Sequence, residues 1–413
     1  MTLPLKGLIN KDNLYFFLLC AFVATIPFQE NLADDMMFLT LIVWFFKYFS
    51  GETRFKRSPL AISIALMLLS IAVSFILNIQ RILSEDIVNQ IQRTLSLSSA
   101  FIWFFIVSTV PITEKKVKYI GGTFFIAFFS AISYLLITYF KNPITSGKRL
   151  TISNYNINFY GTLLALLVLS LIVFILFQKK KSSLICSVFL LILASLALIF
   201  TYSRGAWISL IGGLIAISFL LNRKTKAKLL LTLVVILIVC IVIMATNPLF
   251  LSRIYTIFSK DYNSNALRID LWKTSFKMIP ISPVYGIGPY MFHSYFKVIN
   301  PEHFNIEFVH HACNNYLTVL VEEGLLGLIV YITFIIVAAM KIFQLKKSAN
   351  QLLQYFSIVL LGWLLVVKIY GMFEYTLGIS AFNLFMFLLG LSVSLENNQS
   401  INDPKVVNAK NRN

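Results

Sequence analysis

Charged residues are scarce in this sequence. They make up 13% of its 413 residues, against about 25% in a typical soluble domain. Apolar residues make up 58%, and 38 residues are phenylalanine. This composition excludes a water-soluble globule and a disordered chain. It is typical of a polytopic membrane protein, in which long apolar segments cross the bilayer repeatedly.

Cysteine is also scarce, and its four positions show no CxxC spacing and no zinc-type ligand cluster. A glycine-rich phosphate loop of the Walker type is missing as well, so nucleotide-driven chemistry is not implied. The energy for any reaction must then come from the substrate or from a gradient. We therefore expect no cofactor and no bound metal.

Apolar runs that could cross a bilayer, about 20 residues each, occur twelve times. The predicted spans are 13–29, 35–50, 59–79, 94–111, 119–140, 159–178, 183–202, 205–222, 228–248, 315–341, 351–369 and 375–395. The expected fold is an all-α integral membrane protein with about twelve transmembrane helices. Residues 1–248 would hold the first nine, 249–314 one large loop, 315–395 the last three, and 396–413 a polar tail.

The net charge of +18 is distributed unevenly. If the N-terminus is cytoplasmic, most of the 35 basic residues fall in segments that face the cytoplasm. The first outer segment has no basic residue but carries Glu30, Asp34 and Asp35. This positive-inside pattern predicts that both termini are cytoplasmic. It also accounts for the basic excess without any binding of nucleic acid.

The loop between the ninth and tenth spans is the only long one, and loops of this length are usually functional or disordered. Its many aromatic residues argue against disorder. An amphipathic helix is expected over 268–279 and a second short helix over 290–298. The loop holds all four histidines of the protein, which are His293, His303, His310 and His311.

Two arginines are candidates for binding a phosphate group. Arg204 lies at the predicted outer junction of spans seven and eight. A positive charge on the outer side is contrary to the positive-inside pattern. Arg268 begins the first predicted helix of the long loop. A snorkelling or solvated arginine is the common alternative. Because guanidinium binds phosphate in a bidentate manner, we expect Arg204, paired with Arg268, to clamp a doubly charged leaving group.

Further candidates lie at both ends of the apolar segments. His310 and His311 begin His-His-Ala-Cys-Asn-Asn, which ends the long loop, and an imidazole can act as general base for a hydroxyl acceptor. Asn154, Asn156 and Asn158 precede span six, where helix capping is expected of at least one of them. Gly324 and Gly327 are expected to serve close helix packing.

Taken together, these motifs resemble the O-antigen ligase and O-antigen polymerase superfamily. The similarity rests on Ser203–Trp207 (Ser-Arg-Gly-Ala-Trp), on Arg268, Trp272 and Pro283–Gly288 in the loop, on His311-x-Cys313-Asn314 with Gly324 and Gly327, and on Asn158–Gly161. In this alignment Cys313 occupies the position of the family's second histidine. A neutral thiol is a poor base, so His311, or His310 after a small shift, would take that role unless activation differs here.

The resemblance implies a metal-independent glycosyltransferase of the GT-C type in the bacterial inner membrane, with a large helical periplasmic loop and a periplasmic active site. Its donor would be a glycan on undecaprenyl diphosphate, bound by Arg204 and Arg268. Its acceptor would be a hydroxyl of lipid A–core oligosaccharide, with Asn158 and Asn314 positioning the substrates.

Two other functions remain open at this stage. An O-antigen polymerase would use the same donor and a lipid-linked repeat as acceptor, and the sequence does not separate it from the ligase. A transporter or flippase ranks well behind. The predicted spans hold almost no ionisable residues at mid-membrane and show no paired repeats of broken helices.

Overall fold

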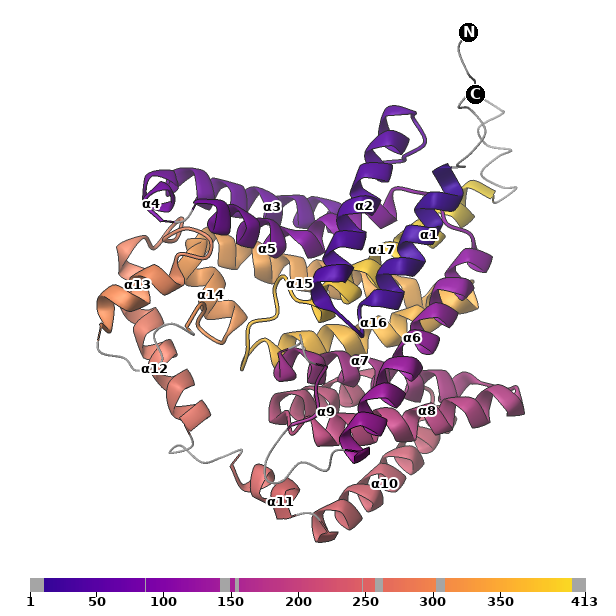
Figure 1. The fold of residues 1–413 in the computed structure, drawn as a ribbon. Coiled ribbons are helices and arrows are strands. Elements are labelled where there is room, and N and C mark those ends of the chain that lie inside the picture. Colours follow the sequence, from indigo (N-terminus) through magenta and orange to yellow (C-terminus); the bar gives the residue numbers. More distant parts are fainter. Residues whose placement is uncertain are drawn as a thin grey trace.

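The computed structural model describes residues 11–85, 87–141, 149–152, 156–246, 248–256, 263–301 and 309–402. Within these ranges every regular element is a helix (Figure 1). The elements are α1 (Lys11–Thr25), α2 (Glu30–Phe49), α3 (Pro59–Leu77), α4 (Ile79–Leu83), α5 (Ile87–Ser108), α6 (Glu114–Lys141), α7 (Ile157–Phe177), α8 (Lys181–Phe200), α9 (Arg204–Ser218), α10 (Arg223–Thr246), α11 (Pro248–Tyr255), α12 (Asn263–Met278), η1 (Ile279–Ile281), α13 (Phe292–Ile299), α14 (Asn315–Glu322), α15 (Gly324–Lys346), α16 (Gln351–Tyr370) and α17 (Ser380–Asn402).

Eight of these helices are long and apolar enough to cross a membrane. They are α3, α5, α6, α7, α8, α15, α16 and α17. Helices α1 and α9 are apolar but only 15 residues long. The expectation of an all-helical membrane protein is confirmed for the described residues. The full count of twelve spans and the GT-C assignment stay predictions.

Helix α7 lies at the centre of the bundle and is buried along most of its length. It is apolar on all sides, as expected for a helix surrounded by other helices. Helices α9 and α16 pack closely beside it because glycines remove side chains from the contact. A Cβ on Gly212 would lie 2.2 Å from Ile369, and one on Gly213 would lie 2.7 Å from Val366. This contact places the start of α9 beside the end of α16.

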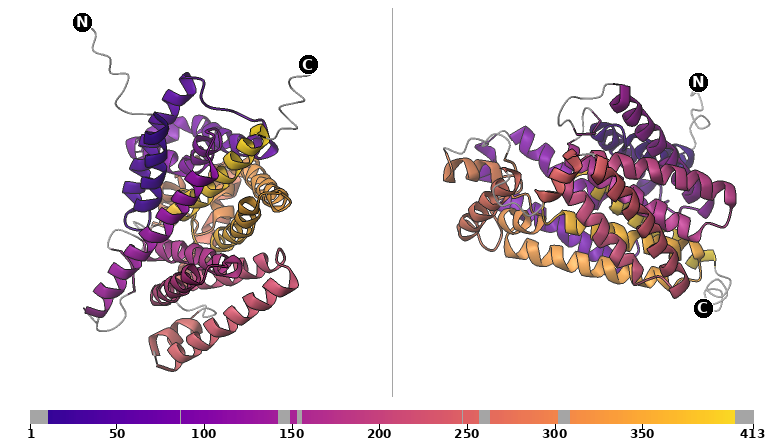
Figure 2. Two further views of the ribbon diagram at one scale, coloured as in Figure 1. Left: turned by 90° about the vertical axis from the view of Figure 1, so that its right-hand side faces the viewer. Right: turned by 90° about the horizontal axis from the view of Figure 1, so that it is seen from below.

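Helices α12, α13 and α14 gather at one end of the bundle, whereas α10 runs along its edge (Figures 1 and 2). The end layer has its own apolar cluster, built around Leu271, Ile287, Phe292 and Phe296. The two helices expected in the long loop are present as α12 and α13. Helix α12 begins five residues before the predicted start at Arg268.

Two predicted spans are wrong in their bounds. The tenth, 315–341, is divided, because α14 ends at Glu322 and α15 begins at Gly324, whose φ is +73°. The twelfth, 375–395, starts too early. Residues 371–379 form no regular helix, and α17 runs from Ser380 to Asn402. The first residues of the predicted polar tail therefore continue α17, and residues 403–413 lie outside the described part.

Candidate functional site

A polar cavity of about 330 Å³ lies where the start of α7, the start of α9, α12 and the end of α16 meet. Its charged lining residues are Arg149, Arg204, Arg268 and Glu374, so three guanidinium groups face one carboxylate and the net charge is +2. Asn158 also lines it. The structure thus brings together three residues that the sequence analysis singled out, namely Arg204, Arg268 and Asn158.

Close contacts hold the first arginine at this cavity. Arg204 is the first residue of α9 and follows Tyr202, whose φ of +52° is uncommon for a non-glycine residue. A Cβ on Gly205 would lie 2.8 Å from the Tyr370 ring, and one on Gly161 would lie 2.8 Å from Ser203 Cβ. The glycines of the Ser-Arg-Gly and Asn-x-x-Gly motifs are therefore required for the cavity wall to close.

A hydrogen-bonded network joins the other charged groups of the cavity. Arg268 donates from Nε to the Phe373 carbonyl oxygen at 2.6 Å, and its Nη2 lies 3.4 Å from Glu374 Oε2. Asn158 donates to the same carboxylate oxygen at 3.3 Å and accepts from Arg149 Nη2 at 2.9 Å. The Glu374 side chain is only 9% exposed. It is therefore a buried carboxylate with charged and amide partners, as buried charges require.

A second, larger cavity of about 580 Å³ lies beside the first. Its titratable lining residues are Glu30, Asp34, Arg93, Tyr290, His310, His311 and Tyr375. The remaining lining includes amides, serines and the Phe159 ring, a mixture of hydrogen-bonding groups and aromatic surface. We call the two spaces the arginine cavity and the outer cavity.

His311, Cys313 and Glu374 connect the two cavities. One possible ligand atom from each lies within 4.8 Å of the others. The His311 ring stacks on Tyr375, with centroids 4.8 Å apart. His311 Nδ1 accepts a hydrogen bond from the Cys313 backbone N–H at 3.2 Å. The neutral imidazole must therefore carry its proton on Nε2.

Burial keeps the groups at this junction uncharged. It lowers the pKa of His311, although the Glu374 carboxylate acts in the opposite direction. Burial, followed by the nearby Arg93 charge, lowers the pKa of His310 to about 4. Burial and then Glu374 raise the pKa of the Cys313 thiol well above its usual value. Near pH 7 both imidazoles and the thiol are therefore neutral.

The same three residues, His311, Cys313 and Glu374, are the ones in the described part of the chain that could hold a metal ion. One nitrogen, one sulfur and one carboxylate oxygen resemble a zinc site with an open position. However, both oxygens of Glu374 already accept hydrogen bonds: Oε2 from Arg268 and Asn158, and Oε1 from the Tyr375 backbone N–H at 3.3 Å. Groups of this chain therefore occupy most of the acceptor sites of the carboxylate, and they hold it in place without a metal ion.

Two asparagines hold the segment that carries Glu374. Asn314 caps α14 through its side-chain oxygen and donates to the Met372 carbonyl oxygen at 3.2 Å. Asn315 donates from its backbone to the Gly371 carbonyl oxygen at 2.7 Å and accepts from the Thr376 backbone N–H at 2.8 Å. Asn314 lines neither cavity, and its contacts are those of a residue that positions residues 371–376. Asn156, as expected of one asparagine before span six, caps α7.

The two glycine motifs that frame the long loop pack against each other. Ile287 and Gly288 donate to the carbonyl oxygens of Val321 and Glu322 at 2.9 and 3.1 Å. A Cβ on Gly286 would lie 2.2 Å from the Glu322 backbone. The predicted close packing at Gly324 is present, since a Cβ there would lie 2.3 Å from the Val284 backbone. These motifs fix the position of the loop and are not part of either cavity.

Comparison with protein families bears on this geometry. Residues 189–332 match a family described as O-antigen ligase. This match makes the middle third of the chain similar to the O-antigen ligase family. No curated protein matches the chain.

The O-antigen ligase match covers Arg204, Arg268 and the histidine segment, but it ends before Glu374 and begins after Arg149 and Asn158. Sequence reasoning missed Glu374 because the predicted twelfth span began at Tyr375 and left it in a short link. The signal that could have found it is a lone carboxylate between two apolar spans. Arg149 was also missed, because no motif in the sequence marks it. His303 and Asn154 lie outside the described residues.

Proposed function

We propose that this protein transfers a glycan from undecaprenyl diphosphate to a hydroxyl of lipid A–core oligosaccharide, at the periplasmic face of a bacterial inner membrane. The observation that carries the proposal is the adjacency of the two cavities through His311 and Glu374. One cavity is cationic and suits a diphosphate, and the other offers aromatic and hydrogen-bonding groups that suit a sugar.

The arginine cavity binds the donor diphosphate in this proposal. Arg204 of α9 and Arg268 of α12 both line this cavity, and guanidinium groups match phosphate oxygens in a bidentate manner. As the bond between the anomeric carbon and the diphosphate oxygen breaks, negative charge grows on the leaving group. Fixed guanidinium groups in a partly buried cavity stabilise that charge.

The acceptor hydroxyl approaches from the outer cavity. In the tautomer set by the Cys313 N–H, His311 Nε2 carries a proton and has no free lone pair, so it cannot accept the hydroxyl proton. We therefore assign the base role to Glu374 and give His311 a positioning role. The acceptor oxygen bonds to the anomeric carbon, its proton passes to Glu374, and the diphosphate leaves with the bonding electron pair.

Donor binding also prepares Glu374 for this step. Arg268 pairs with Glu374 in the empty cavity, and a diphosphate competes for the same guanidinium. When Arg268 turns to the diphosphate, the carboxylate loses this partner, and the oxygen that accepted from Arg268 is available to the acceptor hydroxyl. The base is thereby activated only when a donor is present.

A polymerase is the second candidate, and one observation favours it. The outer cavity has two carboxyl groups, Glu30 and Asp34, and the single arginine Arg93. Burial raises the pKa of Glu30 and raises that of Asp34 to about 7, so the lining has little excess positive charge. Such a lining suits a sugar repeat without charge better than a heavily phosphorylated acceptor. The polymerase would use the same donor chemistry with a lipid-linked repeat in the outer cavity.

Complementation distinguishes these candidates. The gene is expressed in one strain that lacks its ligase and in one that lacks its O-antigen polymerase, and the lipopolysaccharide of each is separated on a gel. A restored ladder in the ligase strain, abolished by Arg204→Ala at normal expression, supports the ligase. If only the strain that lacks the polymerase is rescued, the acceptor is a lipid-linked repeat and the protein is a polymerase. Purified protein in vesicles provides a third test. If it moves lipid-linked glycan across the membrane but transfers no glycan to an acceptor, the protein is a flippase and both enzyme candidates are rejected.

A further inference from the structure

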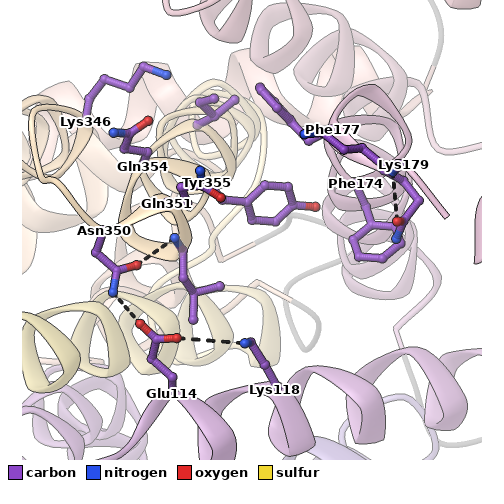
Figure 3. Close-up of a pocket in the computed structure, with 13 residues that line it drawn as sticks. Glu114, Lys118, Phe174, Phe177, Lys179, Lys346, Asn350, Gln351, Gln354 and Tyr355 are labelled. Atoms are coloured by element: carbon purple, nitrogen blue, oxygen red, sulfur yellow. Dashed lines mark hydrogen bonds and ion pairs between the residues drawn. The ribbon is translucent and has the colours of Figure 1, made fainter.

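A second pair of cavities lies at the opposite ends of the helices that form the arginine cavity. Helices α7 and α16 contribute the start of α7 and the end of α16 to the arginine cavity. The end of α7 and the start of α16 line a cavity of about 1010 Å³, together with the start of α6 and the end of α15 (Figure 3). By the positive-inside pattern this end faces the cytoplasm. The reaction proposed above does not use it.

The mouth of this cavity is positively charged. Lys118, Lys179 and Lys346 line it from three different elements, and its one acidic lining residue is Glu114 (Figure 3). Glu114 lies 3.8 Å from Lys118 and accepts a hydrogen bond from Asn350. Within the described residues neither Lys179 nor Lys346 forms an ion pair. Two positive charges are therefore available to an anionic group at the mouth.

An apolar cavity of about 400 Å³ adjoins this charged mouth, and the two share Lys118, Phe174, Leu352 and Tyr355 as lining residues. The other walls of the apolar cavity come from α1, α6, α16 and α17 and are mostly apolar or aromatic. Tyr355 lines both spaces, and its ring lies near Phe174 and Phe177 (Figure 3). The combined space is thus charged at one end and apolar at the other.

Two consecutive glycines on α6 keep the apolar cavity open. A Cβ on Gly121 or Gly122 would meet no atom within 4 Å. Glycine lowers helix stability by about 1 kcal/mol relative to alanine, and in membrane helices it usually allows another helix to approach. Here no other part of the described chain fills the space beside the two glycines, so both leave room for an occupant that is not part of this chain.

We propose that these joined cavities bind one anionic phospholipid from the cytoplasmic leaflet, with its phosphate at Lys179 and Lys346 and an acyl chain beside Gly121 and Gly122. The charge of the mouth selects an anionic headgroup, since each lysine near an anionic lipid surface contributes about 1 kcal/mol. The apolar cavity selects a lipid over a free anion. An acyl chain there would also fill the space between α6, α16 and α17.

Native mass spectrometry of the full-length protein tests the proposal. The protein is stripped of lipid in a non-ionic detergent and titrated with phosphatidylglycerol. We expect one retained lipid per chain and weaker retention of phosphatidylcholine. In the double variant Lys179→Gln, Lys346→Gln the affinity should fall about thirtyfold, since two lysines at about 1 kcal/mol each are removed. The matched control is Lys180→Gln, Lys347→Gln, which removes the same charge from lysines outside the cavity and should bind as the parent does.

Two further measurements test the apolar half of the site. Gly122→Leu places a side chain in the open space and should remove the retained lipid while the protein elutes as a single species. Phosphatidylglycerol with brominated acyl chains should quench Trp363, which lines the apolar cavity, as judged against Trp363→Phe. Four outcomes would each overturn the proposal. Three concern the ligand: equal retention of phosphatidylcholine, competition by inorganic phosphate, or preference for a polyprenyl phosphate. The fourth is unchanged binding in both the lysine and glycine variants.

Discussion

Arg268 Nη2 lies 3.4 Å from Glu374 Oε2, so the group proposed to bind the donor is paired with the group proposed to deprotonate the acceptor. The two residues come from α12 and from the segment after α16. Neither charge is solvated well, since the side chains are 18% and 9% exposed. Replacing either residue therefore changes the electrostatic environment of the other. The effects expected from the two replacements differ, and experiments can separate them.

Replacing Glu374 should affect turnover more than donor binding. Glu374→Gln keeps the shape and the hydrogen bond from Asn158 but removes the base, and loss of a general base typically lowers kcat by about 10²- to 10⁴-fold. Donor affinity should be kept or increased, because the variant no longer competes for Arg268. Turnover of lipid-linked donor in nanodiscs measures the first effect, and binding of undecaprenyl diphosphate measures the second.

Asp270→Asn on α12 is the matched control, because it neutralises an exposed carboxylate outside both cavities. It should leave both quantities unchanged. Full turnover in Glu374→Gln would remove Glu374 from the mechanism and return the base role to His311.

Replacing the arginines should weaken stabilisation of the leaving group. Arg204→Ala and Arg268→Ala should each lower kcat by about 10²- to 10³-fold, the usual cost of removing one fixed group that stabilises transition-state charge. Arg268→Lys should restore little, because an ammonium group cannot hold Phe373, Ser264 and a phosphate together as the guanidinium fork does. Lys273→Ala, an exposed cation on the same helix, is the control. Equal losses in Lys273→Ala would show that only general surface charge matters.

The lowered pKa of His310 predicts that acid destabilises the protein. An unfolded histidine titrates near 6.5, whereas His310 in the folded protein titrates at about 4. Between these values the unfolded state binds the proton more readily, so stability falls as the pH is lowered through this window. Because His310 is partly exposed, we expect at most about 1 kcal/mol from it. The apparent Tm in detergent between pH 7 and pH 5 should fall less for His310→Gln than for the parent. Parallel curves would contradict the assignment.

Three residues that line the arginine cavity could be singled out from the sequence because their signals are local. Arg204 is unusual at an outer helix junction, and Arg268 begins an amphipathic helix, so each residue is visible within a few positions. Their meeting with Asn158 follows from the helix ends that the hydropathy pattern places on one side. The close contact of α9 with α16, which depends on Gly212 and Gly213, is not visible in that pattern.

Glu374 and the division between α14 and α15 were missed for a common reason. A hydropathy window averages over about 20 residues, so a short non-helical segment between apolar residues is merged into the neighbouring span. Residues 371–379 are held in place by Asn314 and Asn315, which lie about 60 positions earlier. Only the three-dimensional contacts show that this segment carries a functional group.

Chelation of divalent metals should leave the activity unchanged. The possible ligands His311, Cys313 and Glu374 form a cluster, but the Glu374 oxygens already accept from Arg268, Asn158 and the Tyr375 N–H. Turnover is measured in nanodiscs before and after dialysis against EDTA. A loss of activity that Zn²⁺ restores would show a metal centre and would replace the mechanism proposed for Glu374. Cys313→Ser offers a second check, since a structural thiol tolerates this change better than a metal ligand does.

The paired glycine motifs should be needed for stability, and the chain supplies a control for the backbone effect. Gly286, Gly324 and Gly51 have nearly equal φ values of +74°, +73° and +71°. A Cβ would meet backbone at 2.2 Å on Gly286 and 2.3 Å on Gly324, but would meet nothing within 4 Å on Gly51. Gly51→Ala should therefore cost only the strain of a left-handed conformation, about 1–2 kcal/mol. Gly286→Ala and Gly324→Ala add a clash that separates 283–288 from 321–326, and should lower the apparent Tm and folded yield further. Equal effects at all three positions would mean that the contact between the motifs does not hold the loop.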